Sequence, residues 1–188
     1  MFSRLGAFFL DILQVIVFAV AIFLFVYLLI LQPHKIKGHS MDPNFEDGEF
    51  ILTDKVSYRF GIPDRGDVVV FKAPPDYIEE FIKRIIALPG DKVMVKENHI
   101  YVNGKQIDET AYLDPAIAVS GGSFTQEGVE VSIPEGQYLV MGDNRPNSFD
   151  GRYFGPITRD KITGKAWVAY WPPKRTGTIQ HYAYTYRE

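Results

Sequence analysis

The chain has 188 residues, of which 46% are hydrophobic and 23% are charged, a mixture typical of folded rather than disordered proteins. Its formal net charge of −3 gives no support to a nucleic-acid partner. Cysteine is absent, which excludes disulfides, thiol nucleophiles and cysteine-bound zinc. The four histidines lack metal-type spacing, so we expect neither a metal site nor a cofactor.

The first predicted element is a membrane anchor over residues 12–31. These twenty residues carry no charge, and Gln14 is their only strongly polar member. A helix of this length is roughly 30 Å long, which matches the hydrocarbon core of a bilayer. A cleaved signal peptide has a shorter apolar run of ~7–15 residues and a small-x-small site, which residues 31–34 do not provide. A core helix of a soluble protein would carry polar residues in each turn.

The charges that flank the predicted anchor do not fix its orientation. Arg4 and the terminal amine precede it and are opposed by Asp11, whereas Lys35 and Lys37 follow it. Counting basic residues on the two sides therefore gives no clean answer.

Residues 32–188 are long enough for one domain and carry the signals of a β fold. Segments rich in Val, Ile, Tyr, Phe and Trp alternate with Gly, Pro, Asn and Asp. We predict strands at Glu49–Val56, Asp67–Lys72, Glu80–Leu88, Lys92–Val95, His99–Val102, Gln137–Met141, Lys165–Trp171 and Thr178–Tyr186. Asn103-Gly104 predicts a two-residue hairpin turn. Residues 111–126 are interpreted as an exposed loop, and no long helical periodicity follows the anchor.

A candidate nucleophile follows the anchor in the segment Gly38-His39-Ser40-Met41-Asp42-Pro43. A serine between Gly38 and Pro43 can lie on a tight turn with an exposed hydroxyl. A nucleophile needs that presentation, together with an activating base and donors for an oxyanion. An ordinary loop serine is the alternative interpretation of the same residues.

A candidate base lies in the predicted strand that contains Phe81–Leu88. Alternate residues of a strand share a face, so Lys83 lies with Phe81 and Ile85 while Arg84 points the other way. Arginine stays protonated and cannot act as a base. Burial lowers the pKa of a lysine, which can then accept a hydroxyl proton near neutral pH. The alternative is that Lys83 extends its amine to water from a half-buried strand.

Residues 142–152 place two acids, two arginines and a serine in one turn-rich segment. A loop held by exposed ion pairs is the simpler interpretation. The sharper hypothesis is a scaffold for the base, in which Ser148 hydrogen-bonds to Lys83 and Asp150 with Arg152 braces the loop.

Together, and in this order, these segments resemble the type I (leader) signal peptidases. Residues 40–44 are similar to that family's nucleophile block, Ser-Met-x-Pro-Thr, and residues 66–71 to a strand block. Residues 83–91 are similar to its base block. Residues 142–152 are similar to its block Gly-Asp-Asn-Arg-x-x-Ser-x-Asp-Ser-Arg. The resemblance covers roughly residues 36–172, and four ordered blocks behind a membrane helix are highly specific.

The resemblance implies a role for each of the candidate residues. Ser40 would be the nucleophile, Lys83 the general base, and Ser148 the residue that orients the Lys83 amine. Structural supports would come from Arg84, Asp143, Asp150 and Arg152.

Substrate contacts follow from the same resemblance. Backbone N–H groups would hold the oxyanion, with Ser40 as the first donor and Gly38 at a position where some members carry a helpful hydroxyl. Losing one such donor costs about 2.7–4 kcal/mol. Ile36 and Ile82, which flank the catalytic residues, are our predicted walls for shallow pockets that select small side chains.

Two further positions depart from the family pattern. Asn44 replaces the usual threonine, a change that we expect to act behind Ser40 rather than on the substrate. Gly151 replaces the usual serine between Asp150 and Arg152.

The resemblance also implies fold, location and activity. We expect two antiparallel sheets, a cytoplasmic tail over residues 1–11, and a catalytic domain over residues 32–188 outside the cytoplasmic membrane. A monomeric enzyme of this kind would contact the bilayer and cut signal peptides from exported preproteins. The alternatives are a specialised Ser/Lys processing protease, a self-cleaving repressor, and a non-catalytic membrane-tethered β module.

Overall fold

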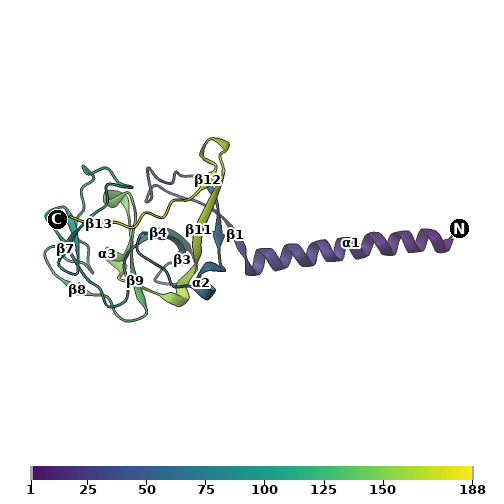
Figure 1. Cartoon of the computed structure of the whole chain (residues 1–188), viewed down its shortest axis with the longest axis horizontal. Helices are drawn as coiled ribbons and strands as arrows, with labels where there is room; N and C mark the ends of the chain where they lie inside the picture. The colour runs from purple at the N-terminus through teal and green to yellow at the C-terminus, as the bar shows by residue number, and fades with distance from the viewer. Residues whose placement is uncertain (1, 188) are drawn as a thin grey trace.

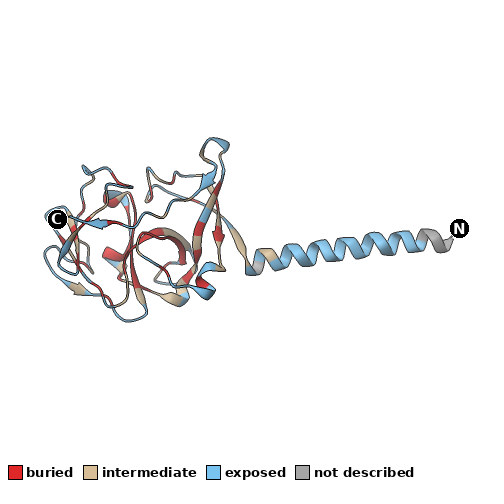
Figure 2. Ribbon diagram, in the orientation of Figure 1, coloured by how far each residue is buried: buried red, intermediate tan, exposed pale blue. Residues whose placement is uncertain are grey.

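The computed structural model describes residues 2–187 and shows one long helix projecting from a β domain (Figure 1). Helix α1, Phe2–Leu29, contains an apolar stretch, Gly6–Tyr27, with a mean hydropathy of 2.8 and no burial within the protein (Figure 2). This stretch of 22 residues is, by length and composition, a candidate membrane span of about 33 Å. The helix ends before the predicted boundary at residue 31, because Leu31 already pairs in a sheet.

The domain consists of two antiparallel sheets, which confirms the predicted fold class. The larger has eight strands in the order β1-β2-β11-β3-β4-β9-β10, with β12 paired to β11. Its strands are β1 (Leu31–Lys35), β2 (Phe50–Asp54), β3 (Val68–Lys72), β4 (Glu80–Ala87), β9 (Gln137–Met141), β10 (Ile157–Thr158), β11 (Ile162–Trp171) and β12 (Gly177–Thr178). The smaller has five strands in the order β13-β7-β6-β5-β8. Its strands are β5 (Lys92–Lys96), β6 (His99–Val102), β7 (Lys105–Asp108), β8 (Val131–Ser132) and β13 (Thr185–Tyr186).

Helical structure after the anchor is limited to single turns. These are α2 (Ser57–Phe60), α3 (Gly151–Phe154) and the 3₁₀ turns η1 (Arg145–Asn147), η2 (Arg159–Lys161) and η3 (Pro173–Arg175). The predicted hairpin at Asn103-Gly104 is confirmed: the two residues join β6 to β7 with φ of 53° and 76°. Both residue types tolerate this left-handed conformation.

One prediction about the remaining segments is wrong, and another is only partly right. The single strand predicted at Thr178–Tyr186 is two short strands separated by irregular backbone, because this segment leaves one sheet and joins the other. The loop at residues 111–126 is irregular as predicted but not simply exposed, since Tyr112, Leu113 and Val119 are buried. The sequence pattern also missed β1, which follows the helix almost without a linker.

Strand β4 lies between β3 and β9 and contributes to all three hydrophobic clusters of the domain. One cluster contains Ile86 together with residues of the smaller sheet, and a second contains Ile85 together with residues of β3 and β9. Ile82 packs against a third cluster, which lies beside β1 and β2. Each fully buried isoleucine contributes about 1.5–3 kcal/mol relative to exposure. The strand that carries Lys83 and Arg84 is therefore among the best-anchored segments of the fold.

Candidate active site

Ser40 lies on a tight turn between β1 and β2. The Asp42 N–H donates to the His39 carbonyl over 3.3 Å, and the Phe45 N–H donates to the Met41 carbonyl over 3.0 Å. Met41 and Phe45 are buried in the cluster beside β1 and β2, so the turn is fastened to the core from below. The serine is thereby held on a fixed backbone.

Asn144 fastens the same turn from the other side. Its N–H donates to the Ser40 carbonyl over 3.0 Å, and its Nδ2 donates to the His39 carbonyl over 2.9 Å. Sequence reasoning did not select this residue, although it lies inside the block at residues 142–152. The segment over residues 142–152 therefore holds the backbone of Ser40 in place.

Lys83 lies beside Ser40. Its Nζ is 2.6 Å from Ser40 Oγ and 2.9 Å from the Ile82 carbonyl oxygen. The residue is only 3% exposed, so its amine does not extend to water. Burial lowers the pKa of Lys83 to about 8, against the opposing effect of the Asp150 and Asp143 carboxylates.

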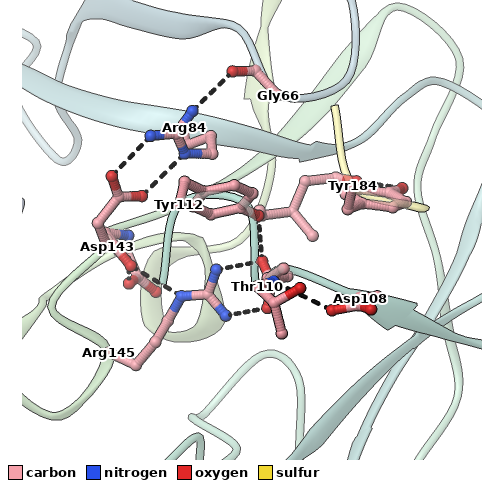
Figure 3. Close-up of polar contacts among 12 residues, drawn as sticks. Gly66, Arg84, Asp108, Thr110, Tyr112, Asp143, Arg145 and Tyr184 are labelled. Atoms are coloured by element: carbon pink, nitrogen blue, oxygen red, sulfur yellow. Dashed lines mark hydrogen bonds and ion pairs between the residues drawn. The ribbon is translucent and has the colours of Figure 1, made fainter. Parts of the chain in front are cut away.

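Arg84 points away from Lys83, as strand alternation predicted, and binds Asp143. Its Nε and Nη2 donate to the two carboxylate oxygens over 2.9 and 2.7 Å, and its Nη1 donates to the Gly66 carbonyl over 3.0 Å (Figure 3). The Tyr112 ring stacks under the guanidinium, 4.0 Å from Cζ. Asn44 Nδ2 donates to the same carboxylate over 2.7 Å and to the Tyr112 carbonyl over 2.9 Å. The asparagine that departs from the family pattern is thus part of this network.

Asp150 and Arg152 form the second buried pair. Arg152 Nε and Nη2 each lie 2.9 Å from a carboxylate oxygen, and the Gly142 N–H donates to Asp150 Oδ2 over 2.9 Å. Burial opposes ionisation of Asp150, yet the hydrogen bonds and charge of Arg152 keep its pKa below the ordinary value. Arg152 Nη2 also donates to the Arg145 carbonyl over 2.7 Å, which closes the loop on itself.

A third ion pair, between Arg145 and Glu109, was not predicted. Arg145 Nη1 donates to Glu109 Oε2 over 2.8 Å, and Nη2 contacts the other oxygen. Glu109 also accepts from the Tyr112 hydroxyl, so this pair joins the loop at residues 142–152 to the network around Arg84. Nothing near Glu109 in the sequence marks it, because its partner is remote along the chain.

Ser148 is buried close to the turn that carries Ser40. Its Oγ has no hydrogen-bond partner among residues 2–187, so the predicted hydrogen bond to Lys83 is not formed, and it lies against Gly142. A Cβ atom at Gly142 would overlap both Ser148 Oγ and the Ser40 carbonyl oxygen. A glycine at this position is therefore required to bring Ser148 and the turn that carries Ser40 together.

The two predicted oxyanion donors differ in their availability. Gly38 has a φ of 85°, and its N–H donates to Asp47 Oδ1 over 2.7 Å, so this donor is occupied. The Ser40 N–H has no acceptor among the residues that the structure describes. It therefore remains free to bind a developing oxyanion.

A cleft of about 500 Å³ opens beside Ser40 and Lys83. Ser40 and Lys83 line it together with the predicted wall residues Ile36 and Ile82. Phe149, which sequence reasoning missed, also lines it and is 57% exposed. The cleft is thus bounded by the chain around β1, by β4 and by the loop at residues 142–152.

The segments that build this site lie within a region shared with known proteins. The family model described as signal peptidase, peptidase S26, matches residues 9–171. A protein of Synechocystis sp. named probable signal peptidase I-2 is 39% identical over 156 residues, which are 80% of this chain and 67% of that protein. Signal peptidase IB of Staphylococcus aureus (strain COL) is 41% identical over 154 residues, covering 76% and 79% of the two chains. A crystal structure of a signal peptidase I from Enterococcus faecalis V583 matches with a TM-score of 0.45 and 30% identity, over 55% of this chain and 96% of its own.

Proposed function

Because the chain belongs to the signal peptidase family, peptidase S26, we propose that Ser40 and Lys83 are its catalytic pair. The chain is a serine peptidase, as are the members of that family. The observation that carries the assignment is the 2.6 Å approach of Lys83 Nζ to Ser40 Oγ in a buried site. There the pKa of the lysine is lowered to about 8, so a neutral amine is accessible near physiological pH.

The reaction is acyl transfer through the serine. Neutral Lys83 accepts the Ser40 hydroxyl proton while Oγ attacks the scissile carbonyl, and the Ser40 N–H binds the oxyanion. Lys83 then protonates the leaving amine and activates a water that hydrolyses the acyl-enzyme. The Ile82 carbonyl accepts from Lys83 Nζ over 2.9 Å and helps to orient the amine; Ser148 Oγ, which is buried beside the Ser40 turn but not hydrogen-bonded to Lys83, would have to approach the amine during the reaction to share that role.

The substrate is a preprotein, cut at the end of its signal peptide. Ile36 and Ile82 form shallow apolar walls of the cleft that accept small side chains before the scissile bond. Helix α1 anchors the enzyme in the cytoplasmic membrane, with the β domain on the extracytoplasmic side. A panel of unrelated precursors separates this general activity from that of a specialised processing protease, which would cut only one class of them.

Cleavage of a labelled preprotein in detergent tests the assignment. Wild type is compared with Ser40→Ala and Lys83→Met, with folding monitored by circular dichroism. We expect both variants to remain folded and to lose cleavage by several orders of magnitude. If either variant cut at close to the wild-type rate, the residue it replaces would not be catalytic.

A further inference from the structure

One end of the cleft is polar. His34 and Glu80 line it, and His34 Nε2 lies 2.8 Å from Glu80 Oε2. His34 Nδ1 lies 2.8 Å from Thr53 Oγ1, and the Thr163 hydroxyl donates to Glu80 Oε1 over 2.6 Å. The four side chains come from four strands, β1, β2, β4 and β11, so the two residues in the cleft are held from several sides. The reaction described above gives this group no role.

His34 and Glu80 come together because the larger sheet curls. Their strands, β1 and β4, are separated in the sheet by β2, β11 and β3, which is roughly 19 Å along a flat sheet. A contact of 2.8 Å between their side chains requires the sheet to bend until the two strands face each other. All four pairings between them are antiparallel, so β1 and β4 run in the same direction. Both walls of the cleft therefore lead from His34 and Glu80 to Ser40 and Lys83.

The spacing along the two walls assigns His34 and Glu80 to a position in the substrate. His34 is two residues before Ile36, and Glu80 is two residues before Ile82, so each lies on the same strand face as its isoleucine. Two residues advance about 7 Å both in a strand and in an extended substrate. An extended substrate turns alternate side chains to one side, so the isoleucine walls meet its first and third residues before the scissile bond. His34 and Glu80 then meet the fifth.

Glu80 presents an ionised carboxylate to this position. A carboxylate offers about four lone-pair sites, and the hydrogen bonds with His34 and Thr163 use two of them. The hydrogen bond with His34, together with that from Thr163, holds the pKa of Glu80 below its ordinary value, although burial opposes this shift. The side chain is 24% exposed and lines the cleft. Such a carboxylate favours a cationic or hydrogen-bond-donating partner.

The neighbouring lysines do not cancel this preference. Lys35 and Lys37 border the cleft, but strand alternation turns their side chains to the face opposite His34. The Lys35 amine lies on that other face over the Phe50 ring, 5.7 Å from its centroid. Lys72, which is opposite Glu80 on β3, is exposed, so solvent and salt screen its charge.

We propose that His34 and Glu80 form a polar subsite that favours lysine, and disfavours an acid, at the fifth residue before the scissile bond. Glu80 contacts the substrate side chain, and His34 holds the carboxylate in place. The inference rests on the proposed function and extends it, because it adds a substrate position that the two isoleucines do not contact.

Soluble peptides that differ only at this residue test the subsite. The ratio of kcat/KM between the lysine and glutamate peptides is measured on one enzyme preparation, so the fraction of active enzyme does not affect it. We expect wild type at low ionic strength to cut the lysine peptide about fivefold faster, the upper end of what a partly exposed ion pair contributes. The preference should weaken as salt is added. It should also be lost when the lysine or glutamate is moved to the fourth residue, whose side chain points to the other side.

A pair of matched variants assigns the preference to Glu80. Glu80→Gln removes the charge and keeps the shape of the side chain, so the lysine preference should disappear. Glu130→Gln removes an exposed carboxylate next to β8 in the smaller sheet, and it should keep the preference. Circular dichroism checks the folding of both variants. If Glu80→Gln does not fold, the wild-type ratio and its salt dependence decide the question.

Several results would overturn the subsite. These are equal rates on the lysine and glutamate peptides, a preference that Glu80→Gln leaves intact, and a preference at the third residue instead of the fifth. Binding of the labelled peptides to Ser40→Ala, followed by fluorescence anisotropy, separates the subsite from catalysis. Tighter binding of the lysine peptide with no cutting of any peptide by wild type would retain the subsite and refute the proposed function. Cutting without any such preference in rate or binding would do the reverse.

Discussion

The pH dependence of cleavage tests the proposed role of Lys83 quantitatively. Only the neutral amine can accept the Ser40 proton, so the rate follows the neutral fraction of Lys83. Burial lowers the pKa of this lysine from 10.5 to about 8. At pH 7 about one tenth of the lysine is then neutral, compared with about one part in three thousand at the ordinary pKa. The site therefore increases the active form about 300-fold, which corresponds to about 3 kcal/mol.

We expect kcat/KM to rise about tenfold per pH unit below pH 8 and to level off above it. The assay is cleavage of a soluble peptide in detergent from about pH 6 to about pH 10 at constant ionic strength. Circular dichroism at each pH shows whether the enzyme stays folded. A soluble peptide avoids effects of pH on a lipid surface.

Two results would refute this reasoning. A rise that continued at unit slope to about pH 10 would mean that Lys83 keeps the pKa of an exposed lysine. A break near pH 6.5 would instead indicate that a histidine limits the reaction. Lys83→Met should abolish activity at every pH. Any residual activity of this variant, and its pH dependence, would come from groups other than Lys83.

We expect three further outcomes from the contacts around the turn that carries Ser40. Gly142→Ala should reduce activity at least 100-fold, because a Cβ there overlaps two site atoms, whereas Gly177→Ala, with open space around it, should cut normally in the same assay. Arg84→Met should lower the free energy of unfolding by about 3–5 kcal/mol, measured by thermal melting, because it leaves Asp143 buried and unpaired. Lys83→Met should raise stability at pH 7. The buried ammonium of Lys83 lowers the stability of the wild type below pH 8. This destabilisation disappears as the pH rises from about 8 to 10.5. The stability advantage of Lys83→Met should therefore shrink between these two pH values.

The parts of the site that depend on local patterns were predictable from sequence. Alternation along one strand placed Lys83 and Arg84 on opposite sides, and the structure has them so. The turn that carries Ser40, and the positions of Ile36 and Ile82 in the wall of the cleft, were predicted from short sequence blocks. In each case the determining information lies within a few residues.

The parts that depend on contacts between remote segments were not predictable. Glu109 is a site residue only because the chain returns it to Arg145. The segment over residues 179–184 has the composition of a strand, yet it crosses between sheets. The Val68 N–H donates to His181 Nδ1 over 3.1 Å, and the Tyr182 carbonyl lies against Gly66, where a side chain would not fit. Such competition between pairing partners is set by tertiary packing rather than by β propensity.

The buried ion pairs also have an electrostatic consequence for Lys83. The Asp143 and Asp150 carboxylates raise the pKa of Lys83, and only burial opposes them. Each carboxylate is paired with an arginine, Arg84 or Arg152, which offsets much of its field at the amine. We infer that the arginines weaken the effect of the two carboxylates, so that desolvation determines the direction of the Lys83 pKa shift. The arginines thereby influence Lys83 without contacting it. Arg152→Met, in whatever fraction folds, should move the break in the pH–activity profile to higher pH. An unchanged break near pH 8 would leave the arginines a purely structural role.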